Sequence, residues 1–416
     1  MTSNTKTVTV NGRAYHWPKA PLVVICCDGS EPDYMEIAMA RGLMPNLKQM
    51  IAKGENKRGA SVIPSFTNPN NLSIVTGAPP AVHGICGNYL IDPATGKETM
   101  MNDPKWLRAS TIFEKFQQAG AKIAVVTAKD KLRLLLGKGL VFDGTAVAFS
   151  TERADKVTLA DNGVEGICET VGMGVPDVYS AELSEFVFAA GVKLLASMRP
   201  DLMYLSTTDY VQHKYAPGSA GANSFYAMMD RYLGQLDAQG AIVVIIADHG
   251  MKDKHLSTGE PDVVYLQDAL DKEFGAGKTR VILPITDPYV VHHGALGSFA
   301  TVYATGISPD AAAKFITGLD GIDVVLDRAA GCARFELPPD RMGDLVVLSG
   351  GAKGSKVIGT SRSKHDLSGL NEPLRSHGGL TEQTVPVIIN RKTHDLPEAL
   401  RNFDAFFIGC NCIIEA

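Results

Sequence analysis

Short apolar runs rich in β-branched residues recur along the chain, and segments with apolar residues at helical spacing separate them. The runs lie at 22–27, 123–127, 202–205, 242–246 and 385–389. Strands that are apolar on both faces are typical of parallel sheets covered by helices on both sides. The spacing of the apolar residues predicts helices from Leu183 to about Met198 and over 224–238. This alternation predicts an α/β fold built on a doubly wound, mostly parallel sheet.

The segment 253–371 interrupts that alternation. Strand-like runs at 299–303, 322–326 and 344–348 and a helix-like segment at 310–319 predict a small α+β unit. A segment of this length is too long to be a loop inside a compact domain. We therefore expect a discontinuous core formed by 1–252 and 372–416, with 253–371 as an inserted cap domain. The Gly-, Ser- and Lys-rich stretch 349–363 within the cap indicates a loop, and His292-His293 lie in the cap without a clear role.

Acidic residues and a histidine follow three of the apolar runs. Asp28 follows the first run, Asp209 follows the third, and Asp248-His249 follow the fourth. The carboxyl ends of strands in doubly wound sheets are where such proteins bind ligands. We therefore expect these four side chains to meet at one edge of the sheet.

Two further histidines complete a set of metal-ligand types. His213 comes four residues after Asp209, so both can share one face of a helix, and His377 stands on the glycine turn His377-Gly378-Gly379. Nitrogen and oxygen donors suit zinc, although manganese or iron accept the same donors. Two such ions about 3.5–4 Å apart can hold both sides of an in-line displacement at phosphorus.

Thr67 is the candidate nucleophile. It stands where the N-cap of a helix ending at Gly77 is expected. A hydroxyl at this point meets free backbone N–H groups that favour a phosphoryl oxygen, and a nearby metal would ease loss of its proton. The alternative is that Thr67 is only a structural cap.

The segments 66–77 and 80–88 resemble the nucleotide pyrophosphatase/phosphodiesterase branch of the alkaline phosphatase superfamily. Asp28-Gly29, Asp209-x3-His213, Asp248-His249-Gly250-Met251 and His377-Gly378 match that family in the same order. The resemblance covers residues of about 20–255 and about 372–392 and leaves the insertion uncovered. It implies an alkaline phosphatase-like core with two Zn²⁺ ions per chain.

The resemblance also implies a role for each matching residue. One zinc would be held by Asp209, His213 and His377. The other would be held by Asp28, Thr67, Asp248 and His249. Asn88 would contact a phosphoryl oxygen, and the substrate would also meet Thr67 and His213.

Two segments, 126–133 and 208–218, are most similar to members of the family that cleave a carbon–phosphorus bond. That similarity implies hydrolysis of phosphonoacetate to acetate and phosphate through a phosphothreonine on Thr67. Lys129 and Lys131 follow the strand at 123–127 and would neutralise this small anionic substrate. A phosphodiesterase or phosphomonoesterase, or a phosphomutase, with the same two-metal core remains the alternative.

Composition narrows the class of protein further. The net charge is −5 with 20% charged residues, which argues against nucleic acid or an anionic membrane as a partner. The seven cysteines are odd in number and scattered, so reduced thiols are expected. The N-terminal segment is polar, unlike a signal peptide, and we expect a cytoplasmic protein. A homodimer is the expected oligomeric state.

Overall fold

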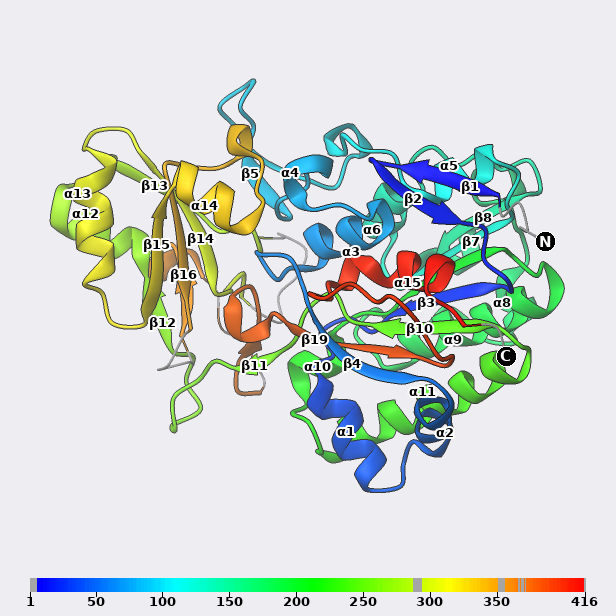
Figure 1. Cartoon of the computed structure of the whole chain (residues 1–416). Coiled ribbons are helices and arrows are strands. Elements are labelled where there is room, and N and C mark those ends of the chain that lie inside the picture. Colours follow the sequence, from blue (N-terminus) through cyan, green and yellow to red (C-terminus); the bar gives the residue numbers. More distant parts are fainter. Residues whose placement is uncertain are drawn as a thin grey trace.

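A seven-stranded mixed sheet forms the centre of the computed structural model, which describes residues 6–286, 294–350, 356–365, 367, 370 and 372–414 (Figure 1). The strands, in spatial order, are β4 (Glu55–Ala60), β19 (Thr384–Ile389), β10 (Ile242–Ile246), β3 (Leu22–Cys26), β9 (Leu202–Ser206), β7 (Ile123–Thr127) and β8 (Ala146–Ser150). The five strands from β10 to β8 are parallel to one another. β19 runs antiparallel to them, and β4, which pairs antiparallel with β19, runs in the same direction as the five. The predicted α/β class with a mostly parallel sheet is confirmed.

Both faces of the sheet are buried, which explains its continuous apolar strands. Leu22 and Val24 of β3 join one apolar cluster, and Val23 and Ile25 join the other. The first cluster includes residues of α3 (Thr67–Thr76), α5 (Ile112–Gln118), α6 (Asp130–Leu136) and α15 (Ala405–Asn411). The second includes residues of α1 (Pro32–Ala40), α2 (Pro45–Lys53), α9 (Glu182–Ser197) and α11 (Ala220–Ala238). Helices therefore cover the sheet on both sides.

Smaller elements surround this core. Two hairpins are β1 (Thr7–Val10) with β2 (Arg13–His16), and β5 (Tyr89–Ile91) with β6 (Glu98–Met100). Short helices are α4 (Pro80–His83), α7 (Leu159–Asn162), α8 (Ile167–Val171) and α10 (Tyr210–Lys214). None of the helices in the described ranges is long and apolar enough to cross a membrane.

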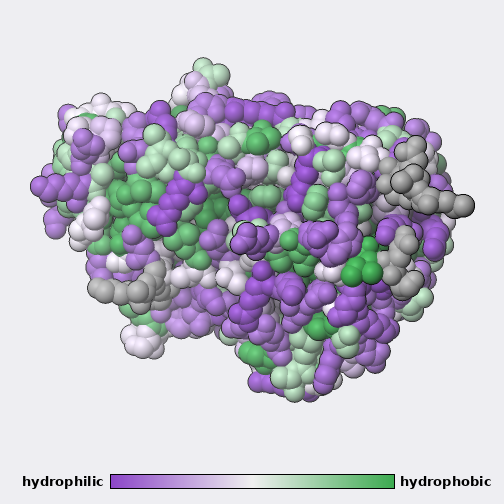
Figure 2. Space-filling view, viewed as in Figure 1, coloured by the Kyte–Doolittle hydropathy of each residue, from purple (hydrophilic) through white to green (hydrophobic). Residues whose placement is uncertain are grey.

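The inserted segment builds its own sheet, at the left of Figure 1. Its strands are antiparallel in the order β13 (Thr279–Ile282), β14 (Phe299–Ala304), β16 (Leu345–Ser349) and β15 (Ile322–Asp327). The accompanying helices are α12 (Leu266–Phe274), α13 (Pro309–Thr317) and α14 (Arg328–Phe335). The boundaries 253 and 371 of a cap domain stay a prediction. Figure 2 shows hydrophobic side chains gathered over β14 to β16, whereas they are interspersed with hydrophilic ones over the core.

The chain enters and leaves this insertion along a common path. It leaves the core through β11 (Lys252–Asp253) and returns through β18 (Arg375–Ser376), and these two strands pair antiparallel. This pairing joins the chain that follows Asp248-His249 to the chain that precedes His377.

Three local predictions need correction or lie outside the described residues. The helix predicted over 224–238 begins earlier, at Ala220, where Ser219 caps it by accepting from the N–H of Ala222. The stretch predicted as a loop contains a strand, β17 (Val357–Gly359), because it pairs with β12 (Val263–Tyr265). His292-His293, and 351–355 of that stretch, lie outside the described residues.

Candidate active site

Three histidines meet beyond the carboxyl ends of the central strands, and each has its Nδ1 tied to a backbone carbonyl. The rings are those of His213, His249 and His377. Their Nδ1 atoms donate to the carbonyl oxygens of Arg375 at 2.7 Å, Gly250 at 2.9 Å and Ser65 at 2.8 Å, respectively. A carbonyl can only accept, so each Nδ1 donates its proton outward and each Nε2 is the ring nitrogen turned toward the site. A hydrogen bond from Nδ1 to a backbone carbonyl is typical of histidines that bind a metal through Nε2.

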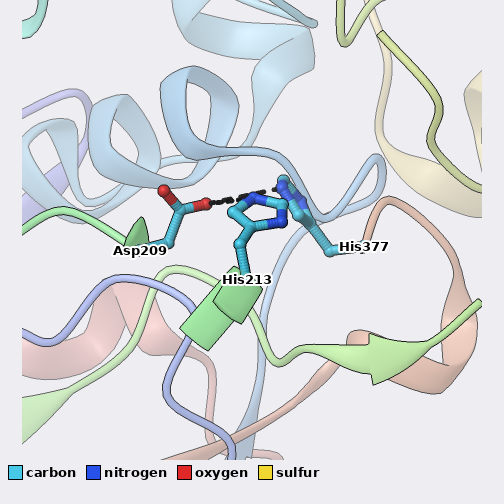
Figure 3. Close-up of side chains that lie close together, drawn as sticks. All are labelled: Asp209, His213 and His377. Carbon is cyan, nitrogen blue, oxygen red and sulfur yellow. Dashed lines mark ion pairs between the residues drawn. The ribbon is translucent and has the colours of Figure 1, made fainter. Parts of the chain in front are cut away.

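The first group of potential ligands is Asp209, His213 and His377 (Figure 3). Asp209 is the N-cap of α10, and His213 lies one turn later, as the spacing predicted. The Asp209 Oδ2 atom is 2.9 Å from His213 Nε2 and 3.7 Å from His377 Nε2. His377 joins them from the far end of the insertion, where Gly378 has a φ of 116°.

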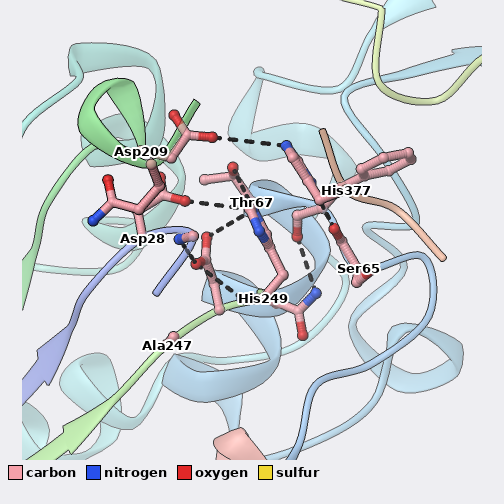
Figure 4. Close-up of polar contacts among 12 residues, drawn as sticks. Asp28, Ser65, Thr67, Asp209, Ala247, His249 and His377 are labelled. Atoms are coloured by element: carbon pink, nitrogen blue, oxygen red, sulfur yellow. Dashed lines mark hydrogen bonds and ion pairs between the residues drawn. The ribbon is translucent and has the colours of Figure 1, made fainter. Parts of the chain in front are cut away.

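The second group surrounds His249 (Figure 4). Its Nε2 lies 3.4 Å from Asp28 Oδ1, 3.5 Å from Asp248 Oδ2 and 3.4 Å from Thr67 Oγ1. Asp28, Asp209 and His249 also place one ligand atom each within 4.8 Å of one another. Asp209 is therefore within reach of both groups, whereas the family resemblance implied a role in one.

The carboxylates of the two groups lie close together and are largely buried, so their negative charges require a cation. Desolvation raises the pKa of Asp28 well above its ordinary value, and the carboxylates of Asp209 and Asp248 raise it further, while Lys129 counteracts them. Burial also raises the pKa of Asp248. The Oδ1 atom of Asp28 is buried and has no hydrogen-bond partner in the part of the chain that the structure describes. Cations bound among these oxygens and the histidine Nε2 atoms would satisfy both deficits, so the residues fit a metal centre.

Thr67 stands at the start of α3 but does not cap it. The helix begins at Thr67, and Phe66 is the N-cap with no side-chain capping bond. The expected N-cap position is thus one residue off. Because its hydroxyl is not engaged with the helix N-terminus, Thr67 Oγ1 is available to face His249 Nε2 at 3.4 Å.

Asn71, which the sequence did not identify as a site residue, holds Asp248 of the second group in place. Its Nδ2 donates to Asp248 Oδ2 at 3.2 Å, while its Oδ1 accepts from Tyr204 Oη at 2.7 Å and Ser206 Oγ at 3.0 Å. The other oxygen of Asp248 accepts from the backbone N–H groups of Gly29 and His249. The position of Asn71, one turn after Thr67 on α3, is the only signal that could have identified it.

The predicted substrate contacts come from two further loops. Lys129 is the N-cap of α6, directly after β7. Its Nζ lies 3.4 Å from the carbonyl of Val178 and 5.4 Å from the centre of the Tyr179 ring. Lys131 lies in the first turn of α6, and both lysines are half-buried. The charge of Lys129 lowers the pKa of Asp28, against the larger upward effect of burial, so Lys129 acts on the metal-ligand cluster.

Asn88 lies where the core meets the insertion. Its N–H donates to the Pro284 carbonyl at 2.7 Å, and its buried Oδ1 has no hydrogen-bond partner within the described ranges. His83 supports the same loop: its Nε2 is 2.9 Å from Ser73 Oγ, and its Nδ1 accepts from the N–H of Ile85. His83 is thus a structural residue.

A mostly parallel sheet with acidic residues and histidines at the carboxyl ends of its strands is the mark of one class of protein. The family model of type I phosphodiesterase / nucleotide pyrophosphatase matches residues 22–379, and the chain belongs to that family. The resemblance to this family in the sequence is confirmed. A murine ectonucleotide pyrophosphatase/phosphodiesterase 5 structure, 18% identical over 94% of both chains with a TM-score of 0.63, shares the fold.

Within this class, phosphonoacetate hydrolase from Sinorhizobium meliloti 1021 is far more similar. Its structures, in complex with phosphonoformate and with phosphonoacetate, are 60% identical to this chain. The match covers 98% of this chain and 99% of that chain, with a TM-score of 0.95. The predicted similarity to this particular group of hydrolases is thereby confirmed.

Curated relatives are more distant and longer. An uncharacterized pyrophosphatase/phosphodiesterase of Schizosaccharomyces pombe is 25% identical over 246 residues, 56% of this chain. The venom phosphodiesterase of Macrovipera lebetinus is 24% identical over 270 residues. The chain spans 45% and 28% of the length of these two relatives. These partial matches therefore say nothing about the activity of the whole protein.

Proposed function

We propose that this chain hydrolyses the carbon–phosphorus bond of phosphonoacetate to acetate and phosphate. The observation that carries the proposal is the 60% identity to phosphonoacetate hydrolase over nearly the whole chain. The two groups of metal-ligand side chains around Asp209 support it, because they supply the donors that the family's chemistry requires.

Thr67 is the proposed nucleophile. Its Oγ1 lies beside His249 Nε2 and is not used to cap α3, whose first N–H groups favour a phosphoryl oxygen. Attack at phosphorus forms an oxygen–phosphorus bond on Thr67 while the bond to carbon breaks. Asn88 Nδ2 is the proposed donor to another phosphoryl oxygen.

Two metal ions are part of the proposal, with zinc the preferred species and manganese or iron as other candidates. Asp209, His213 and His377 would hold one ion. The other would be held by Asp28, Thr67, Asp248 and His249. When bound, such ions supply positive charge that stabilises the attacking hydroxyl oxygen and the phosphoryl group.

The carbon leaving group explains the two lysines. The electron pair of the broken bond passes to carbon and delocalises into the neighbouring carboxylate as an enediolate-like species. Lys129 and Lys131 would stabilise that charge. One proton completes acetate and balances the proton that the Thr67 hydroxyl gives up on attack. Water releases phosphate from Thr67, so the overall reaction consumes one water. A carboxylate next to the cleaved bond is therefore the expected requirement.

A phosphodiesterase, a phosphomonoesterase and a phosphomutase remain the alternatives. A side-by-side assay of phosphonoacetate against nitrophenyl phosphate esters separates the first two from the proposal. We expect phosphonoacetate to give the higher kcat/KM, and faster turnover of the esters would refute the proposal. A mutase would yield an isomer without free phosphate.

We further propose a homodimer that works in the cytoplasm. All seven cysteines are free thiols, which suits a reducing compartment. Sedimentation analysis of the purified chain tests the dimer, and localisation of the tagged chain in cells tests the compartment.

A further inference from the structure

A buried ion pair lies at the neck of the insertion, outside the site described above. Lys254 Nζ is 2.9 Å from Glu382 Oε1, and both side chains are 0% exposed. Lys254 directly follows β11, and Glu382 lies shortly after β18, the strand that pairs with β11. The ion pair therefore joins the chain that has just left His249 to the chain that has just passed His377.

Glu382 holds the backbone next to both histidines. The N–H of Gly250 donates to the Glu382 carbonyl at 2.7 Å, and the N–H of Gly379 donates to Glu382 Oε2 at 3.0 Å. The carbonyl of Gly250 in turn accepts from His249 Nδ1. One residue thus fixes the acceptor that orients His249 and the turn that carries His377.

Ser65 completes this arrangement on the side of His377. Its Oγ donates to the Gly379 carbonyl at 2.8 Å and accepts from the Gly378 N–H at 3.1 Å, and its carbonyl accepts from His377 Nδ1. Gly379 is therefore held on its N–H by Glu382 and on its carbonyl by Ser65. Loss of the Glu382 carboxylate would free the turn on one side and let the His377 ring shift.

Stability alone does not account for such a pair. Apolar residues of similar volume often replace a buried ion pair without loss of stability, whereas removal of one partner leaves an uncompensated charge. The carboxylate of Glu382 uses its two oxygens on two different segments, Oε1 on Lys254 and Oε2 on Gly379. This bridging contact fixes a position that an apolar pair could not.

We propose that Lys254 and Glu382 are positioning residues that hold His249 and His377 in place and thereby set the metal affinity of the site. The inference rests on the proposed function, because it takes these histidines as metal ligands. It adds a determinant that lies outside the ligand groups and joins the core to the insertion.

The test measures zinc affinity of the full chain, stripped of metal, by competition with a chromophoric zinc chelator. Glu382→Gln and Lys254→Met are the single variants. The double variant Lys254→Met/Glu382→Leu removes both charges and leaves no unpaired ion to destabilise the fold. We expect all three to bind zinc at least about tenfold more weakly, as is known for the loss of groups that hold metal ligands in place. The d–d absorption of bound cobalt(II) should shift as well.

Asp230→Asn is the matched control. Asp230 is a buried acid on α11 whose carboxylate is used at another helix: it accepts from the N–H groups of Asn46 at 3.1 Å and Leu47 at 2.7 Å at the start of α2. It should lower Tm and leave zinc affinity within about twofold of wild type, since an acid outside the metal-binding loops affects stability alone.

The double variant decides the outcome. If Lys254 and Glu382 only neutralised each other, removing both charges together would restore zinc affinity. Zinc affinity equal to wild type in the double variant would overturn the inference. If the wild-type chain binds no zinc, the metal centre of the proposed function fails as well, which is a different result. Single variants that fail to fold leave the double variant to carry the test.

Discussion

The imidazole rings of His249 and His377 stack with their centres 3.7 Å apart and their planes at 8°. The whole insertion separates the two residues in the chain, yet the pairing of β11 with β18 brings them together. His249 Nε2 faces Asp28 and Asp248, whereas His377 Nε2 faces Asp209. The stacked pair therefore places the two ligand groups side by side. Burial, and the other two histidines, lower the pKa of His377 well below its ordinary value, which favours the neutral form that binds a metal.

Replacement of Thr67 by Ala should nearly abolish phosphate release. The variant lacks the proposed nucleophile, and loss of a nucleophile in such enzymes costs at least about 10³-fold in kcat. Thr67→Ser keeps a hydroxyl and should retain measurable turnover. Zinc affinity should fall less than activity, since three other residues remain to hold that ion. Wild-type rates in Thr67→Ala would mean that Thr67 is only a structural residue.

Replacement of Asn71 by Ala should weaken metal binding without touching a proposed ligand. The change removes the donor to Asp248 Oδ2 and leaves that carboxylate free to rotate. Loss of such a supporting contact costs about 10–100-fold in metal affinity. Thr76→Ala is the control at the other end of α3, where the hydroxyl donates to the Leu72 carbonyl. Equal zinc affinity in both variants would argue against a supporting role for Asn71.

Lys129→Met and Lys131→Met should affect substrates according to their charge. We expect KM for phosphonoacetate to rise by about tenfold or more, because a positioned charge-assisted contact is lost. Turnover of a nitrophenyl phosphonate without a carboxylate should change much less. Lys122→Met, at the opposite and exposed end of β7, is the control. If both substrates lose the same factor, the lysines do not select for the carboxylate.

His83 should make the protein sensitive to acid. Burial is the main cause that lowers its pKa to about 3, below the value of about 6.5 expected in the unfolded chain. Between those values the unfolded state binds more protons, so stability falls as pH drops from about 6.5 towards 3. His83→Asn removes this group. Thermal unfolding of metal-free protein should show a smaller loss of Tm from pH 7 to 5 in the variant, and an equal loss would contradict the assignment.

Sequence patterns predicted the elements whose residues are neighbours in the chain. Continuous apolar runs such as β3 and β10 identified the sheet, and their carboxyl ends identified Asp28, Asp248 and His249. β4 (Glu55–Ala60) was missed because it is a polar edge strand that lacks an apolar pattern.

The supporting contacts could not be predicted, because they join residues far apart in the chain. The carbonyl of Ser65 that orients His377 and the ion pair of Lys254 with Glu382 exist only once the insertion has folded back on the core. Neither side of these contacts carries a local signal. The reach of Asp209 to both ligand groups likewise depends on the three-dimensional arrangement.

Phosphate release from phosphonoacetate, measured before chelation, after chelation and after added zinc, tests the central claim most directly. We predict release by the untreated wild-type chain, loss of activity after chelation and recovery on addition of zinc, with Thr67→Ala inactive throughout. Undiminished release after complete removal of metal, or no release from phosphonoacetate by zinc-loaded wild type, would contradict the account.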